Sequence, residues 1–132
     1  MSRPESMKQY DYIESDDAYD MGVEWMRNGN IEKAIACFNH AIELNPRFSY
    51  AYIMMARAHA SKKDFTGAIH VLKKATRTDP EFDRLPYLMA KYSYKNGDYK
   101  NALMFIEKAL EREEKELYLL AKSIIEEMYH RR

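Results

Sequence analysis

The stretch Met21–Pro46, MGVEWMRNGNIEKAIACFNHAIELNP, contains two apolar-patterned segments separated by the polar turn Asn28-Gly29-Asn30. In both segments, apolar and small residues recur every three or four positions, which is the spacing of one face of an α-helix. Pro46 ends the second segment, because the residue before a proline is biased away from the helical conformation. The stretch therefore predicts a helical hairpin.

The hairpin pattern is repeated at a fixed interval, since Pro80 follows Pro46 by 34 residues. Small residues hold three positions in each of three copies, namely Gly22, Ala34 and Ala41; Ala56, Ala68 and Ala75; and Ala90, Ala102 and Ala109. Small side chains let two helix axes approach to about 8 Å, the lower end of the usual range. The sequence therefore predicts three hairpins whose paired helices pack closely.

These offsets resemble those of the tetratricopeptide repeat (TPR) family, whose repeat of about 34 residues carries large, Leu-Gly, Tyr, Ala, Phe, Ala and Pro positions. The first copy reads Ala18, Met21, Gly22, Trp25, Ala34, Phe38, Ala41 and Pro46. The second reads Tyr52, Met55, Ala56, His59, Ala68, Leu72, Ala75 and Pro80, and the third Pro86, Met89, Ala90, Ser93, Ala102, Ile106 and Ala109. The third copy departs from the pattern at Pro86 and at Glu114, which stands where the last proline is usual. The resemblance implies an all-α, right-handed α-solenoid of three TPR hairpins plus a C-terminal capping helix.

The prediction divides the chain into a flexible acidic, tyrosine-bearing tail (1–14), three repeats (15–48, 49–82 and 83–114) and a capping helix (115–132). Within the repeats, turn and cap signals predict helices at about 16–28, 31–44, 48–61, 65–78, 83–95 and 99–112. We expect Ser15 to cap the first helix. We expect Asp83 to begin the fifth, so that Pro86 falls in the first turn, where no backbone donor is lost.

The last segment carries an apolar stripe at steps of three and four residues, formed by Leu117, Leu120, Ala121, Ile124, Ile125 and Met128. A stack of repeats leaves the apolar face of its final helix pair exposed and needs a cap with a polar outer side. The stripe is therefore expected to pack on the last hairpin. Docking of a partner on this helix is the alternative interpretation.

Composition favours one soluble domain without catalytic machinery. The 132 residues are 46% hydrophobic, and 21 lysines and arginines balance 21 aspartates and glutamates, so bulk charge predicts neither nucleic-acid nor membrane binding. With one cysteine, Cys37, and no secretory segment or long apolar run, we expect a cytoplasmic protein. Because no nucleophile–base, phosphate-loop or metal-ligand motif occurs, we expect no enzyme activity, no cofactor and no metal site.

The family resemblance implies a concave groove, lined by the first helix of each repeat, that binds a peptide or a partner helix. In this register the groove residues are Tyr19, Val23, Met26 and Arg27; Tyr50, Ile53 and Arg57; and Arg84, Tyr87, Lys91, Tyr94 and Lys95. Clustered cations attract acidic partners, and tyrosines offer rigid contact area with a polar tip. We therefore expect a protein-interaction module, an adaptor or scaffold, whose groove binds a segment with acidic and apolar residues.

Two alternatives use the same residues. In one, the chain is a structural homo-oligomer whose acidic tail occupies its own or a neighbour's groove. In the other, the interleaved tyrosines and cations bind single-stranded RNA, although the neutral net charge argues against it. The carboxylate clamp of chaperone-binding TPR domains is not expected, because its lysine and asparagine positions correspond here to Tyr19 and Val23.

Overall fold

The structure is a computed structural model that describes residues 5–131, with the backbone alone for residues 5–10. Its described part contains helices and no strand, which confirms the predicted all-α class. In chain order the helices are α1 (Glu5–Arg27), α2 (Ile31–Leu44), α3 (Ser49–Ser61), α4 (Phe65–Thr78), α5 (Arg84–Lys95), α6 (Tyr99–Arg112) and α7 (Glu116–His130).

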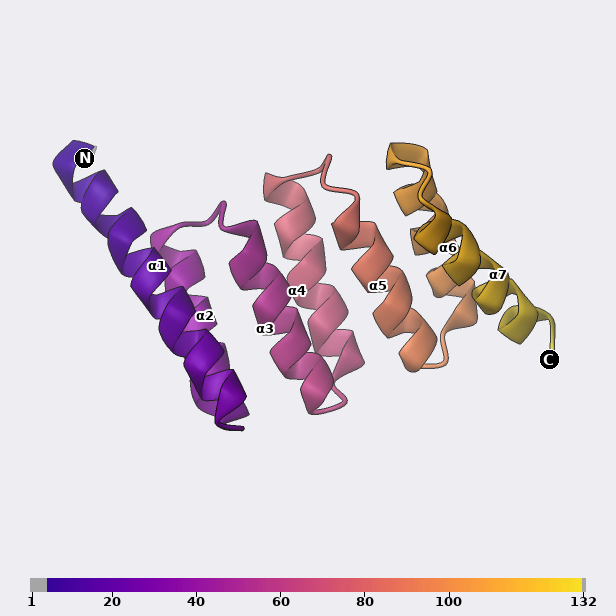
Figure 1. Ribbon diagram of the computed structural model, residues 1–132, viewed down its shortest axis with the longest axis horizontal. Helices are drawn as coiled ribbons and strands as arrows, with labels where there is room; N and C mark the ends of the chain where they lie inside the picture. Colours follow the sequence, from indigo (N-terminus) through magenta and orange to yellow (C-terminus); the bar gives the residue numbers. More distant parts are fainter. Residues whose placement is uncertain (1–4, 132) are drawn as a thin grey trace.

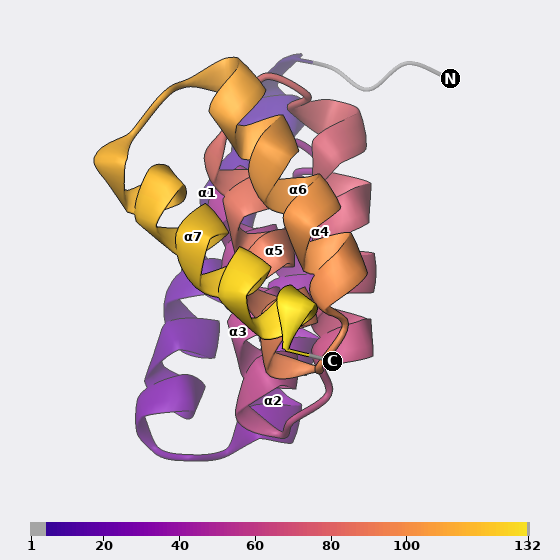
Figure 2. The same ribbon diagram turned by 90° about the vertical axis from the view of Figure 1, so that its right-hand side faces the viewer.

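The helices form a solenoid of hairpins. Each helix packs on the helices before and after it in the chain, so α1 pairs with α2, α3 with α4, and α5 with α6. Successive hairpins lie side by side along the long axis of the molecule, and α7 lies at the end formed by α5 and α6 (Figures 1 and 2). Helix α1 also contacts α3, so the first two hairpins touch through their first helices as well.

All nine small residues of the repeat are buried. The eight alanines expose at most 1% of their surface, and Gly22 is also buried. A Cβ atom added at Gly22 would lie 2.5 Å from Cε1 of Phe38, so the ring occupies the space that a side chain would need. Phe38 and its equivalents Leu72 and Ile106 are fully buried as well. The repeated positions in the sequence are thus the packing positions of the core.

The turns within the hairpins share one geometry. Gly29 and Gly97 have φ angles of 81° and 78°, and Lys63 takes the equivalent position with φ 62°. Glycine adopts this left-handed conformation without strain, whereas a lysine does so at a cost. The residue after each of the three is an N-cap whose side chain accepts a backbone hydrogen bond: Asn30 from Lys33, Asp64 from Gly67 and Asp98 from Asn101.

Helices α2 to α6 begin and end within one residue of the predicted ranges. Pro86 lies in the first turn of α5, as predicted, and Asp83 precedes that helix. The Asp83 side chain makes no capping hydrogen bond, however, and instead binds two residues near the start of α7.

The predicted start of the first helix is wrong. Helix α1 begins at Glu5, so the segment predicted as a tail is helical from there onward, and residues 1–4 lie outside the described part. Ser15, expected as the cap, is fully buried within the helix, and its Oγ donates a hydrogen bond to the carbonyl oxygen of Ala41 at 2.8 Å. In the part of α1 whose side chains are described, the first two buried residues, Asp11 and Ser15, are polar, so hydrophobic periodicity does not reveal that they are buried.

Helix α7 caps the stack with a narrower face than predicted. Tyr118 and Ile125 are buried, whereas Leu117, Leu120 and Ile124 expose 52%, 59% and 45% of their surface. The predicted burial of these last three side chains is therefore wrong. They follow one side of α7 at intervals of three and four residues, and we call them the exposed α7 stripe.

A polar link fixes the cap to the start of α5. Asp83 Oδ2 accepts hydrogen bonds from the hydroxyl of Tyr118 and, at 2.9 Å, from Nζ of Lys115. The ring of Tyr118 stacks on that of Tyr87, with centroids 5.0 Å apart. The Tyr118 hydroxyl and then Lys115 hold the pKa of Asp83 below its usual range. Burial, and then the hydrogen bond to Asp83, raise the pKa of Tyr118 to about 12.

Replacing Ala68 by leucine should lower the free energy of unfolding by about 1–3 kcal/mol, because the side chain would have to enter the fully packed interface between helices. Urea unfolding followed by circular dichroism measures this. The matched control is Ala36→Leu on the exposed side of α2, which should change stability by less than about 0.5 kcal/mol. Equal effects of the two substitutions would contradict close packing at the repeated alanines.

The Asp83 link should make stability depend on pH. Because the folded-state pKa of Asp83 is lowered, its contribution is present above the unfolded-state pKa of about 3.9 and is lost as pH falls through the folded-state value. We expect Asp83→Asn to destabilise the protein at pH 7, and the difference from the unmodified protein to shrink on acidification. Urea unfolding at a series of pH values measures it. Asp17→Asn, at an exposed position of α1, is the control.

Candidate functional site

The predicted groove residues all lie on α1, α3 or α5, the first helices of the three hairpins. They differ in accessibility. Tyr50 and the cations Arg57, Arg84, Lys91 and Lys95 are exposed. Ile53, by contrast, exposes only 5% of its surface and packs in the core.

The predicted groove residues on α1 are mainly apolar, and the one cation among them is paired. Val23 and Met26 are half-buried against the core. Tyr19 packs its ring against Phe48, with centroids 4.9 Å apart. Arg27 Nη1 donates a hydrogen bond to Oε1 of Glu24 at 2.6 Å, so its charge is already paired.

The cations of α3 and α5, by contrast, form a group of like charges. We call Arg57, Arg84, Lys91 and Lys95 the cation cluster. Among the side chains of residues 11–131, none of the four makes an ion pair. Burial, and then the positive charges of Lys95, Arg57 and Arg84, lower the pKa of Lys91. The four charges therefore act on one region of space, and that region is positive although the protein as a whole is neutral.

Tyrosine rings border the cation cluster on α5 and α3. Tyr87 is held by its stacking on Tyr118, and Tyr94 packs at a tilt on Tyr99, with centroids 5.6 Å apart. Tyr50 exposes 59% of its surface. Because rings held in this way lose little freedom on binding, they can contribute contact area at low entropic cost.

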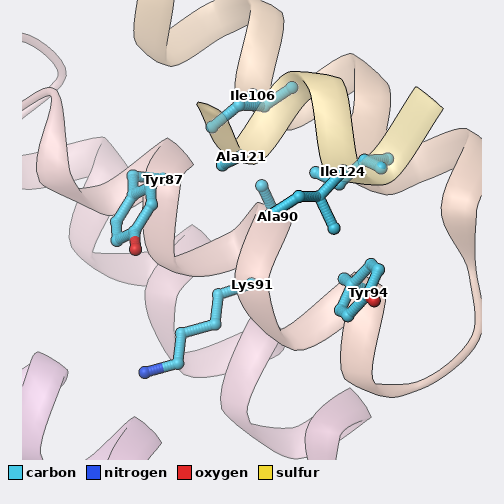
Figure 3. A pocket seen from close by; sticks show the side chains of 8 residues that line it. Tyr87, Ala90, Lys91, Tyr94, Ile106, Ala121 and Ile124 are labelled. Atoms are coloured by element: carbon cyan, nitrogen blue, oxygen red, sulfur yellow. The ribbon is translucent and has the colours of Figure 1, made fainter. Parts of the chain in front are cut away.

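A cavity of about 150 Å³ lies between α5, α6 and α7, beside the cation cluster (Figure 3). Its lining residues are Tyr87, Ala90, Lys91, Tyr94, Ile106, Ala121, Ile124 and Ile125. Lys91 extends along the edge, with its nitrogen directed away from α7 (Figure 3). We call this cavity, together with the exposed α7 stripe, the α5–α7 trough.

The sequence prediction missed the trough, although a signal was present. Residues 117–120 are four consecutive apolar side chains, and a helix that packs by one face cannot bury all of them. Which of them stay exposed depends on the rotation of α7 about its axis. The contacts of Tyr118 with Asp83 and Tyr87 determine that rotation.

Among the described residues, no three histidine, cysteine, aspartate or glutamate side chains are grouped so that they could hold a metal ion. No helix in the same part of the chain combines the length and apolar character needed to cross a membrane.

The arrangement of paired helices on a 34-residue interval defines a TPR solenoid. The family model described as "Anaphase-promoting complex, cyclosome, subunit 3" matches residues 27–109, which is more than half of the chain. The chain therefore belongs to this family of TPR proteins. No curated protein sequence gives a significant match.

Several solved TPR structures share the fold. The Sgt2 TPR domain of Aspergillus fumigatus is 21% identical with a TM-score of 0.77, and the match covers 89% of this chain and 80% of that one. The second TPR domain of human RPAP3, solved with HSP70 peptide SGPTIEEVD, is 18% identical with a TM-score of 0.75, covering 90% and 98%. Yersinia enterocolitica SycD, a type III secretion chaperone solved with a peptide of the translocator YopD, is 17% identical with a TM-score of 0.76, covering 88% and 92%.

Removing a neighbouring charge should change the titration of Lys91. We expect Lys95→Ala to raise the pKa of Lys91 towards that of an ordinary lysine, because a like charge that disfavours its protonated form is lost. NMR titration of labelled lysine side chains measures the pKa. Lys100→Ala, on α6, should leave it unchanged. A Lys91 pKa that does not respond to Lys95→Ala would show that the two charges do not interact.

Proposed function

We propose that this chain is a protein-interaction module whose concave face binds a segment of another protein that carries acidic and apolar residues. The observation that carries the proposal is the cation cluster, whose four charges have no acidic partner in the described part of the chain. Cations on a solvated face often pair with neighbouring acids, and these do not. Burial is the first cause of the lowered pKa of Lys91, and the positive charges of Lys95, Arg57 and Arg84 are the next; a ligand carboxylate would offset these positive charges.

The apolar part of the ligand would occupy the α5–α7 trough. Burial of apolar surface contributes about 25 cal/mol per Å², and each exposed charge pair adds at most about 1 kcal/mol. Ordering a short segment offsets much of this gain, so micromolar affinity is expected. The charges would contribute mainly to the choice of partner and to the rate of association.

The family and the solved relatives support a role in protein interaction. The family is named after a subunit of a multiprotein complex, and the human RPAP3 domain and SycD were solved with peptides. The RPAP3 ligand SGPTIEEVD combines acidic and apolar residues. In this chain the cations stand on α3 and α5, whereas the first-repeat positions of the carboxylate clamp hold Tyr19 and Val23. We therefore expect a different partner sequence from that of the chaperone-binding domains.

Charge reversal tests the proposal. Short random peptides selected on the unmodified protein should be enriched in glutamate or aspartate together with leucine, isoleucine or tyrosine. The double variant Arg57→Glu, Lys91→Glu should bind the selected peptides at least roughly tenfold more weakly, since two attractive pairs become repulsive. Fluorescence anisotropy measures the affinity.

The matched control is Lys74→Glu, Lys100→Glu, which changes the net charge equally at exposed positions of α4 and α6. It should bind the selected peptides normally. Selection of basic peptides, or equal loss of binding in the two double variants, would count against the concave face as the binding site.

A further inference from the structure

We infer that the α5–α7 trough binds its partner segment as an amphipathic α-helix, with acidic residues on one flank only, and not as an extended strand. This inference rests on the proposed function and adds the conformation and the charge pattern of the partner.

The trough has almost nothing that could satisfy an extended backbone. Apart from the hydroxyls of Tyr87 and Tyr94 and the ammonium group of Lys91, the side chains that line its cavity consist of carbon and hydrogen only. No asparagine, glutamine, serine or carboxylate lines the cavity to accept hydrogen bonds from peptide N–H groups. An extended segment would bury unpaired backbone groups there, at a cost comparable to lost hydrogen bonds. A helix satisfies those groups internally and presents only side chains.

The walls of the trough have the spacing that receives a helix. On α7, Leu117, Leu120 and Ile124 follow one another by three and four residues, which spans about 10 Å of helix. On α5, Tyr87 and Tyr94 are seven residues apart and span about the same length. Tyr87 stacks on Tyr118 near the start of both helices, and Tyr94 lines the cavity together with Ile124, so α5 and α7 run in the same direction along the trough. A groove between two such ridges suits a third helix with apolar residues at i, i+3 or i+4, and i+7.

Charge differs between the two sides of the trough. The α5 side carries Lys91 and Lys95 and continues to Arg57 on α3. On the α7 side the described lysines and arginine are already paired: Lys115 with Asp83, Lys122 with Glu107 and Arg131 with Glu127. Acidic residues on the second flank of a partner helix would therefore face this described part of α7 without an unpaired lysine or arginine to bind them. The fitting partner therefore has an apolar stripe, acidic residues on the flank facing α3, and neutral or basic residues on the other.

Three labelled peptides of equal composition test the inference. The first is a helix, cross-linked on its outer face, with leucines at i, i+4 and i+7 and glutamates on one flank. The second is uncross-linked and alternates leucine with polar residues, which favours an extended strand. The third is the cross-linked helix with glutamates divided between the two flanks. We expect the first to bind in the micromolar range, and the other two at least roughly tenfold more weakly.

Matched substitutions on α7 locate the binding. Ile124 and Leu119 expose the same 45% of their surface, but Ile124 lines the trough and Leu119 does not. Ile124→Glu should weaken binding of the first peptide at least roughly tenfold, through loss of apolar contact and repulsion of its glutamates. Leu119→Glu should leave binding unchanged. Circular dichroism and thermal unfolding check that both variants keep their helical fold.

The outcomes separate this inference from the proposed function. One outcome is that the alternating peptide binds the unmodified protein as tightly as the helix does and binds the Arg57→Glu, Lys91→Glu variant more weakly. That result would agree with an acidic partner and refute its helical conformation. If the helix binds equally well to the Ile124→Glu variant, the trough is not its site. If none of the peptides binds and the random-peptide selection also fails, the proposed function falls together with the inference.

Discussion

The close approach of paired helices is the constraint on which the rest of this structure depends. It is possible because small residues at three positions of each hairpin are buried where the helix axes are nearest. At Gly22 even one added carbon atom would collide with the ring of Phe38. Since packed interiors tolerate little change in volume, these positions determine how the hairpins stack and therefore where the first helices of the hairpins stand relative to one another.

The placement of the last helix depends on a few polar and aromatic contacts. Asp83, beside the first turn of α5, binds Tyr118 and Lys115, and Tyr118 stacks on Tyr87. These contacts select which side of α7 faces the stack. The result is a cap that closes the core with Tyr118 and Ile125 and leaves an apolar stripe exposed next to a cavity. One helix thus contributes both to stability and to the candidate binding surface.

The cation cluster illustrates how a locally unfavourable arrangement can indicate a binding site. Four like charges without acidic partners repel one another, and the lowered pKa of Lys91 reflects that repulsion together with burial. Packing does not require charge at these exposed positions. The total charge of the protein is balanced, yet none of its described acidic residues pairs with these four cations. Such an arrangement favours encounter with an acidic partner.

The sequence by itself determined the fold class, the helices from α2 to α6 and the positions of the core, because turns, prolines and small residues act locally and recur on one interval. The 34-residue repeat also predicted that the basic residues of α3 and α5 belong to one surface. The sequence could not show that α1 starts well before Ser15. A serine at this position is typical of a helix cap, and only its hydrogen bond to Ala41 of α2 shows that it lies inside the helix. Nor could the sequence tell that Ile53 is buried while Ile124 is exposed. Those outcomes follow from how each helix rotates against its neighbours, which only the tertiary contacts decide.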